Sequence, residues 1–145
     1  MMPFDSYPQQ GRLLLRRAVG SNCRHGYGLL FMRVTKQTTC AYCGFDLVAS
    51  FENWLQMALD HVVPKSFCKS VALPDEWAED CINKVLACSA CNGFDNRYKA
   101  LALTVCPQSV EAFCLLRDHI FAERKARVAA CRQDEQVFFS ERPWE

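Results

Sequence analysis

The sequence predicts an α+β fold in which a small strand–strand–helix unit is flanked by α-helices. Three observations predict it. Two Cys-x-x-Cys pairs, CAYC (40–43) and CSAC (88–91), enclose a long insert. Within that insert, two short apolar runs, ending at LDH (59–61) and LAC (86–88), have the length of strands. A long amphipathic run after Ser109 is typical of a helix.

Length and composition fit one domain. The chain has 145 residues, of which 50% are hydrophobic and 23% charged, enough for one modest core but not for two. We expect a single domain over residues 1–145. Its core would be residues 38–99, with a basic helical region at 1–37 and a helical extension at 100–145.

The N-terminal residues lack the pattern of a secretion signal. MMPFDSYPQQGRLLLRRAVG carries an acid and two prolines where such a signal has basic and then apolar residues. No run in the chain approaches the roughly 20 apolar residues that span a bilayer. We therefore expect a cytoplasmic protein without a membrane partner.

The elements before the hairpin follow from local signals. Residues 11–19 predict a short helix that stops near Gly20, and residues 29–36 predict a helix leading into the first cysteine pair. Gly44 suits the turn that closes that pair. The segment 51–56 is expected to be helical or irregular.

The insert reads as strand, loop, strand and helix. MALD (57–60) fits a strand, residues 83–88 a second apolar strand, and residues 89–99 a short helix despite Gly93. Between them, residues 65–80 show no strong periodicity and predict a loop with one helical turn after Pro74.

Ser109 is a suitable cap for the long C-terminal helix. Apolar side chains recur on one face of this helix: Val110, Phe113, Leu116, Ile120 and Phe121. Basic side chains are expected outside that face: Arg117, Arg124, Lys125 and Arg127. Such a helix could also pair with a second copy or with a partner protein.

The two cysteine pairs predict a structural zinc site. A Cys-x-x-Cys turn directs two thiolates at one ion, and two such turns supply the four sulfurs of a tetrahedral site: Cys40, Cys43, Cys88 and Cys91. A redox motif is the competing interpretation, but the alternating strands and helices of a thioredoxin-like fold are missing. The remaining six of the ten cysteines fit small buried residues.

Charge is unevenly distributed although the net charge is only +1. Residues 1–39 contain six Lys or Arg and one acid, whereas residues 40–100 contain five bases and eight acids. A basic N-terminal region is a candidate for contacting phosphates. The alternative is that residues 11–19 and 29–36 are amphipathic helices whose solvated faces happen to be basic.

Polar side chains gather where the insert would fold back on itself. Asp60 and His61 end the first strand, and Asn92 follows directly after Cys91. Asn96 lies one helical turn further on. Folding around zinc could therefore bring oxygen ligands and one imidazole together.

These motifs resemble the HNH endonuclease superfamily, whose members contain a ββα-metal (His-Me finger) core. The resemblance covers residues 38–99 and rests on CAYCG, LDHVVPKS, NKVLACSACN and NRY, which occur in compatible order and spacing. It implies a zinc-stabilised ββα core and a DNA-cleaving hydrolase. Nothing in residues 1–37 or 100–145 adds to it.

The resemblance implies a role for each residue. His61 would be the general base, and Asp60 and Asn92 would hold a catalytic Mg²⁺ or Mn²⁺ ion. Asn96 is a weaker candidate for a third ligand, and Asn83 would brace the loop that carries His61. Family members often have a lysine where this chain has Asp95, with Arg97 and Lys99 nearby. Either one of these cations takes over the phosphate contact of that lysine, or Asp95 adds a metal ligand, which leaves open whether Asp95 or Asn96 completes the metal site.

Two other classes of protein remain open at this point. A zinc-stabilised module could bind nucleic acid without any catalysis, and a thiol protein could use the cysteine pairs for redox chemistry. Asn92 could simply cap its helix. The expected partner is DNA, with RNA not excluded, and no base-reading motif is present.

Overall fold

The computed structural model describes residues 2–8, 23–94 and 106–145. Its secondary structure consists of helices and one pair of strands, in agreement with the predicted α+β class. In chain order the elements are the 3-10 helix η1 (Pro3–Ser6), α1 (Tyr27–Thr35), α2 (Phe51–Trp54), β1 (Met57–His61), α3 (Lys65–Ser70), α4 (Asp75–Ala78), the 3-10 helix η2 (Cys81–Asn83), β2 (Lys84–Cys88), α5 (Ser89–Phe94) and α6 (Val110–Ser140).

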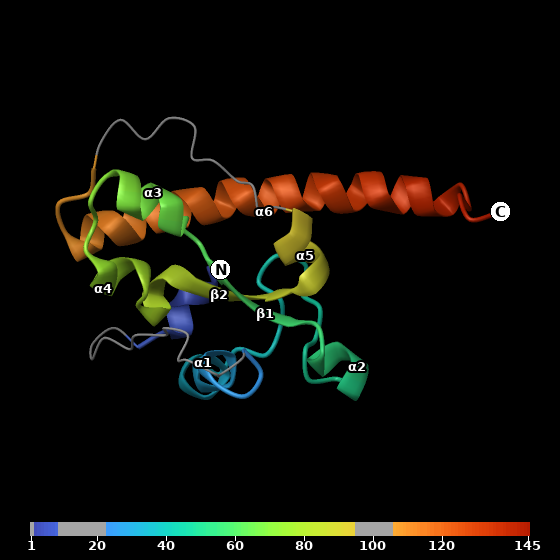
Figure 1. Cartoon of the computed structure of the whole chain (residues 1–145), viewed down its shortest axis with the longest axis horizontal. Coiled ribbons are helices and arrows are strands. Elements are labelled where there is room, and N and C mark those ends of the chain that lie inside the picture. The colour runs from blue at the N-terminus through green and yellow to red at the C-terminus, as the bar shows by residue number, and fades with distance from the viewer. Residues whose placement is uncertain (1, 9–22, 95–105) are drawn as a thin grey trace.

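β1 and β2 form an antiparallel pair at the centre of the molecule (Figure 1). Met57 lies opposite Cys88, and His61 lies opposite Lys84. Every residue of β2 is buried, which explains its continuous apolar sequence after Lys84. α5 begins directly after β2, so the hairpin and this helix form the strand–strand–helix unit that the sequence predicts.

α6 runs along one side of the hairpin, whereas α1 and α2 lie on the other side (Figure 1). The Ser109 hydroxyl accepts a hydrogen bond from the backbone N–H of Ala112 at 3.1 Å, which confirms the predicted cap. Phe113, Ile120 and Phe121 are buried on its inner face. The C-terminal end of α6 extends beyond the rest of the molecule.

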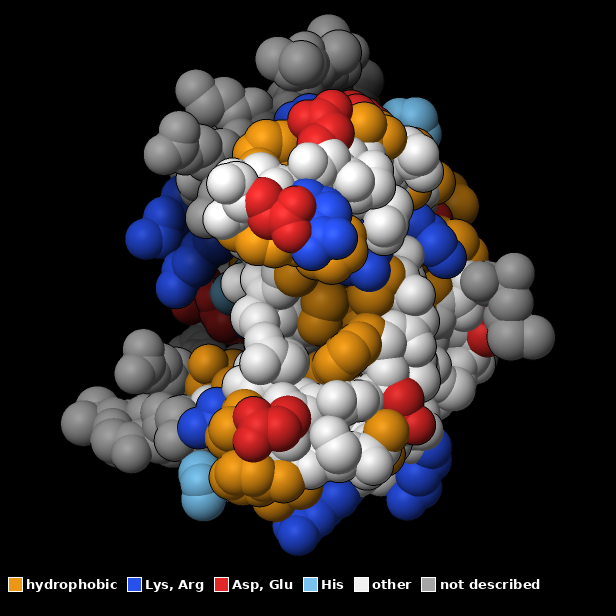
Figure 2. Space-filling model, turned by 90° about the vertical axis from the view of Figure 1, so that its right-hand side faces the viewer, with side chains coloured by type: hydrophobic (Ala, Val, Ile, Leu, Met, Phe, Trp, Pro, Cys, Tyr) orange, Lys and Arg blue, Asp and Glu red, His pale blue; other side chains and the backbone are white. Residues whose placement is uncertain are grey.

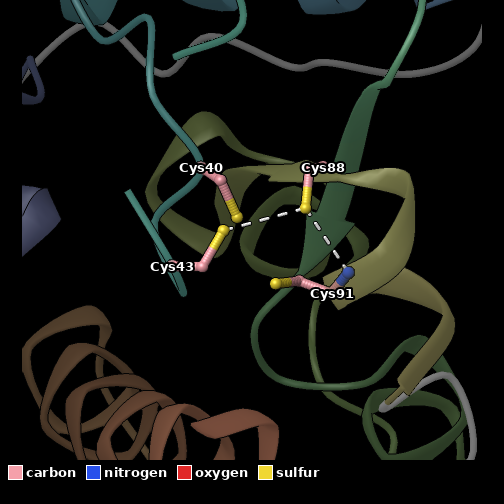
Figure 3. A group of neighbouring side chains, drawn as sticks. All are labelled: Cys40, Cys43, Cys88 and Cys91. Atoms are coloured by element: carbon pink, nitrogen blue, oxygen red, sulfur yellow. Dashed lines mark hydrogen bonds between the residues drawn. The ribbon is translucent and has the colours of Figure 1, made fainter. Parts of the chain in front are cut away.

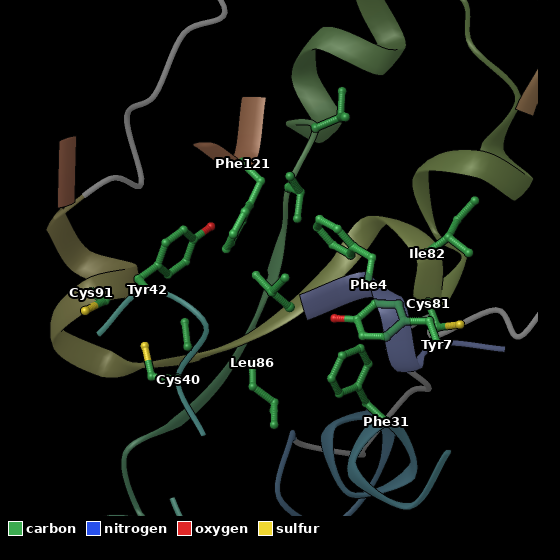
Figure 4. Packing of buried hydrophobic residues seen from close by; sticks show 14 of the residues in the cluster. Phe4, Tyr7, Phe31, Cys40, Tyr42, Cys81, Ile82, Leu86, Cys91 and Phe121 are labelled. Atoms are coloured by element: carbon green, nitrogen blue, oxygen red, sulfur yellow. The ribbon is translucent and has the colours of Figure 1, made fainter. Parts of the chain in front are cut away.

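The hydrophobic core joins segments that are far apart in the sequence (Figure 4). Phe4 packs edge-on against Phe121 of α6, and Tyr7 packs edge-on against Phe31 of α1. The Tyr7 hydroxyl donates a 2.7 Å hydrogen bond to the carbonyl of Lys84. The N-terminal residues therefore close the core between α1, α6 and β2.

The structure confirms the helical turn predicted after Pro74 and corrects the rest of the loop predicted for residues 65–80. This segment contains two short helices, α3 and α4, which follow Pro64 and Pro74. A proline fits the start of a helix because its missing N–H has no partner there. Six and four residues respectively are too few to produce a visible hydrophobic period.

Two arginines of α6 are buried, although the sequence predicts them outside the apolar face of the helix. Arg117 and Arg124 are buried, with 7% and 3% of their surface exposed. Arg117 donates to the carbonyl of Ile82 and lies over the ring of Phe4. Arg124 donates to the carbonyl of Val62. A helical period cannot reveal these contacts, because the acceptors belong to distant segments.

Candidate metal centre and the polar cluster at the hairpin end

Four cysteine side chains meet beside the hairpin (Figure 3). Cys40 and Cys43 lie in the turn after α1, Cys88 ends β2, and Cys91 lies within α5. Their Sγ atoms all lie within 4.8 Å of one another. This is the grouping that the two Cys-x-x-Cys pairs predict.

The first cysteine turn is shaped by its backbone. Gly44 has a φ of 79°, a conformation that side chains disfavour, and its N–H donates to the carbonyl of Cys40 at 2.8 Å. The N–H of Cys40 donates to the carbonyl of Phe45. The N–H of Ala41 donates to the carbonyl of Leu86, which fixes the turn against β2.

The geometry of the cluster fits a zinc ion. A tetrahedral zinc with bonds of about 2.3 Å separates its sulfurs by about 3.8 Å, and the Sγ atoms of Cys43 and Cys88 are 3.8 Å apart. A hydrogen bond from Cys88 lowers the pKa of Cys40 to about 4, whereas burial and the Cys40 charge raise the pKa of Cys91 to about 12. A divalent cation would stabilise all four as thiolates. The cluster could therefore hold a structural zinc ion.

Arg132 of α6 contacts this cluster from outside. Its Nη1 atom lies 3.7 Å from Sγ of Cys91. Four thiolates around one divalent cation leave a net negative charge, which a guanidinium can partly neutralise. α6 thus contributes to the candidate metal centre although it contains none of the four cysteines.

Asp60 points toward α6. Its Oδ2 atom accepts a 2.7 Å hydrogen bond from the hydroxyl of Tyr42 and lies 2.9 Å from Nη2 of Arg124. Arg124 also donates to the carbonyl of His61 at 2.6 Å. The carboxylate is therefore part of a buried ion pair that fixes the end of β1 to α6.

His61 has a different set of partners. Its Nε2 atom lies 2.7 Å from Nζ of Lys84, its cross-strand neighbour, and 3.0 Å from Oε1 of Glu79. Lys84 also donates to Oε2 of Glu79 at 3.1 Å, and Nζ of Lys65 lies 3.4 Å from Oε1. We call His61, Lys65, Glu79 and Lys84 the His61 cluster. Because successive strand residues face opposite sides, Asp60 does not join it.

Burial and charge keep His61 neutral. Desolvation and the nearby Lys84 charge lower the pKa of His61 below 6.5. Burial also lowers the pKa of Lys84. For Glu79, burial acts to raise the pKa, but the contacts with His61 and Lys84 outweigh it and lower the pKa to about 2. Nε2 of His61 lies within hydrogen-bond distance of both Lys84 Nζ and Glu79 Oε1, so the ring tautomer decides whether this nitrogen accepts from Lys84 or donates to Glu79.

Asn83 holds the backbone that follows His61. Its side chain is fully buried and donates to the carbonyls of Val63 and Ala78, at 3.1 and 3.0 Å. Its Oδ1 atom accepts from the N–H of Val63 at 2.8 Å. The amide thereby connects the chain after β1 to the end of α4.

Asn92 is the fourth residue of α5 and so does not occupy the capping position. Among the described residues, the side chain of Asn92 has no hydrogen bond to Asp60 or His61. Asn96 and Asp95 lie outside the described residues, as do the helix expected at residues 11–19 and most of the basic N-terminal arginines. Of the predicted ligands of the catalytic cation, the structure therefore describes Asp60 and Asn92. No contact between these two side chains is present among the described residues.

Sequence reasoning missed Glu79, Lys84 and Arg124. Lys84 had a detectable signal, because it is the one charged residue on an otherwise apolar strand and would face His61 once the two strands are aligned. Glu79 and Arg124 had none, since their contacts with His61 and Asp60 join segments that are distant in sequence.

Compared with known protein families, curated proteins and solved structures, the chain has no significant match. In the described part of the chain, no helix combines the length and the apolar character needed to cross a membrane.

Proposed function

We propose that the protein is a zinc-stabilised HNH-type endonuclease that hydrolyses phosphodiester bonds of DNA. His61 is the general base, and Asp60 and Asn92 are the candidate ligands of a catalytic Mg²⁺ or Mn²⁺ ion. The observation that carries this proposal is a neutral imidazole at the end of β1, in a strand–strand–helix unit that a four-cysteine cluster closes.

A neutral imidazole suits the chemistry of a general base. His61 would take a proton from a water molecule, which attacks the phosphorus atom while the bond to the 3′ oxygen breaks. A pKa below 6.5 means that His61 is unprotonated at neutral pH. The residue is 28% exposed at its side chain, so a solvent-borne substrate can approach it.

The backbone around His61 is held from two sides, which supports its role as a positioned base. Arg124 of α6 donates to the carbonyls of His61 and Val62. Asn83 binds both backbone groups of Val63. Rigid support of this kind keeps a catalytic side chain in one geometry.

The cation would stabilise the negative charge that develops on the phosphate and on the leaving oxygen. Asp60 is the strongest candidate ligand because it is a hard oxygen donor. In the structure its Oδ2 atom is already paired with Arg124. A cation at this carboxylate would compete with Arg124 for its negative charge, so metal dependence is a direct test of the proposal.

DNA would be held mainly through its phosphates. Arg24, Arg33 and Lys36 are the described members of the basic N-terminal region, and Lys65 stands 52% exposed beside His61. Phosphate contacts of this type give an affinity that falls with salt and carries little sequence information.

Both candidate catalytic side chains, Asp60 and His61, already interact with other charged side chains of the protein. This observation favours a second function. Asp60 is paired with Arg124, and Nε2 of His61 lies within hydrogen-bond distance of Lys84 and Glu79. A zinc-stabilised module that binds nucleic acid without cutting it would contain such satisfied side chains. This alternative predicts binding that is independent of Mg²⁺ and of His61.

The two functions are distinguished by incubating supercoiled plasmid with the zinc-loaded protein in Mg²⁺, in Mn²⁺ or in chelator. His61→Ala is the test variant, and His119→Ala is the matched control because His119 is exposed on α6. Zinc content and DNA affinity are measured for each protein, so that loss of folding or of binding is separated from loss of catalysis.

The nuclease proposal expects nicking in Mg²⁺ or Mn²⁺, a rate reduced at least about 100-fold in His61→Ala, and an unchanged rate in His119→Ala. Equal cleavage by His61→Ala would remove the assigned base. Binding without cleavage under any of these conditions would favour the non-catalytic module.

A further inference from the structure

The C-terminal end of α6 carries apolar side chains that the rest of the described chain does not cover. We call residues 131–145 the α6 tail. Phe138, Phe139 and Trp144 are 55%, 61% and 61% exposed, and Val137 is 50% exposed. The rings of Phe139 and Trp144 pack together with centroids 5.1 Å apart. Exposed aromatic clusters of this kind mark interaction surfaces.

A groove opens at the base of the same tail. It has a volume of about 370 Å³, and its walls include Phe45, Cys88, Ala90 and Arg132. Figure 2 looks at this end of the molecule and shows apolar side chains in a hollow between two lobes. The other lobe contributes Glu52, Asn53 and Gln56 to the walls. The groove is large enough for an aromatic ring.

We propose that this surface binds a second copy of the chain, with the two α6 tails packed antiparallel about a two-fold axis. Each tail would then place its aromatic residues over the groove of the other copy. In a two-fold symmetric dimer, both copies use the same surface. The projecting tail of each copy can therefore bind in the groove at the base of the other copy's tail.

The charge pattern of the tail favours this occupant. Arg132 lines the groove, and Glu135 and Phe139 follow it three and seven residues later on the same face of the helix. Antiparallel packing brings the Arg132 end of one tail next to the Glu135 and Phe139 region of the other. An ion pair or a cation–π contact can form twice across the axis.

The exposed rings supply a large part of the area that a modest dimer needs. Aromatic side chains have roughly 150–250 Å² each, so the three exposed rings offer roughly 270–440 Å² per chain at their exposed fractions. Two copies supply roughly 45–75% of the roughly 1,200 Å² at the lower limit of stable interfaces. The groove walls and the flanks of the tails supply the remainder.

The test is sedimentation of the zinc-loaded full chain at concentrations from about 1 to 100 µM, the range in which an interface of this size associates. The double variant Phe139→Glu and Trp144→Ala removes the aromatic pair. Leu115→Glu is the matched control, because Leu115 is 72% exposed at the other end of α6.

Wild type and Leu115→Glu are expected to dimerise, and the double variant to have a dissociation constant at least about tenfold higher, with unchanged zinc content and circular dichroism. A wild-type protein that stays monomeric over the whole range overturns the proposal. A double variant that dimerises as tightly as wild type also overturns it. Both outcomes are independent of nuclease activity.

Discussion

Replacing Asn83 by alanine is expected to destabilise the protein strongly, because the Asn83 amide fills three hydrogen-bonding positions without any exposure to water. The substitution leaves the N–H of Val63 and the carbonyls of Val63 and Ala78 without these partners. A buried backbone group that loses its partner costs about 1–3 kcal/mol. Carbonyls tolerate this better than N–H groups, so the total should be about 3–5 kcal/mol.

This cost is a large part of the total stability of a small domain, about 5–15 kcal/mol. It corresponds to a melting temperature lower by roughly 6–20 °C for a chain of this size. The free energy of unfolding should be measured by urea titration, followed by circular dichroism. Excess zinc should be present throughout, because metal release would otherwise contribute to the transition.

Asn53→Ala is the matched control. The Asn53 side chain donates to the carbonyl of Asp46 at 2.7 Å, but this contact is exposed to solvent. Water can replace it, so the control should lose no more than about 1 kcal/mol. A loss below about 1 kcal/mol in Asn83→Ala as well would refute the reasoning that burial makes these hydrogen bonds costly to remove.

Three further predictions concern the metal centre and the His61 cluster. Cys91→Ser should reduce zinc bound per chain, measured by elemental analysis, and should lower the melting temperature; full zinc retention would contradict the assigned ligand set. Arg132→Met should weaken zinc retention against a chelator by about tenfold. The control Arg142→Met should leave zinc retention unchanged, because Arg142 is exposed and pairs with Glu145. Stability should fall as the pH drops below 6.5, because the folded-state pKa of His61 lies below that value and the unfolded chain binds the proton first. The Glu79 contribution is present above pH 4.5 and is lost toward pH 2. His61→Gln should remove the first part of this dependence, and a stability difference from wild type that is constant between about pH 7 and pH 5 would contradict it.

The sequence by itself determined the features that depend on spacing along the chain. The Cys-x-x-Cys pairs predict the four-cysteine cluster, because the spacing within each pair already places two sulfurs side by side in one turn. Folding then has only to bring the two turns together. Ser109 and the apolar period after it predict α6, and the two apolar runs predict β1 and β2. A helical period and the length of an apolar run are local properties, so they can be read without knowing the fold.

Only the tertiary structure decided the partners of the charged residues. Arg117 and Arg124 belong to a helix whose sequence suits solvent exposure of both, yet they are buried against carbonyls of Ile82, His61 and Val62. Glu79 reaches His61 only because α4 and η2 fold back beside the hairpin. The physical reason is that the energy of a buried charge depends on partners brought together by packing, and these partners are far away in the chain.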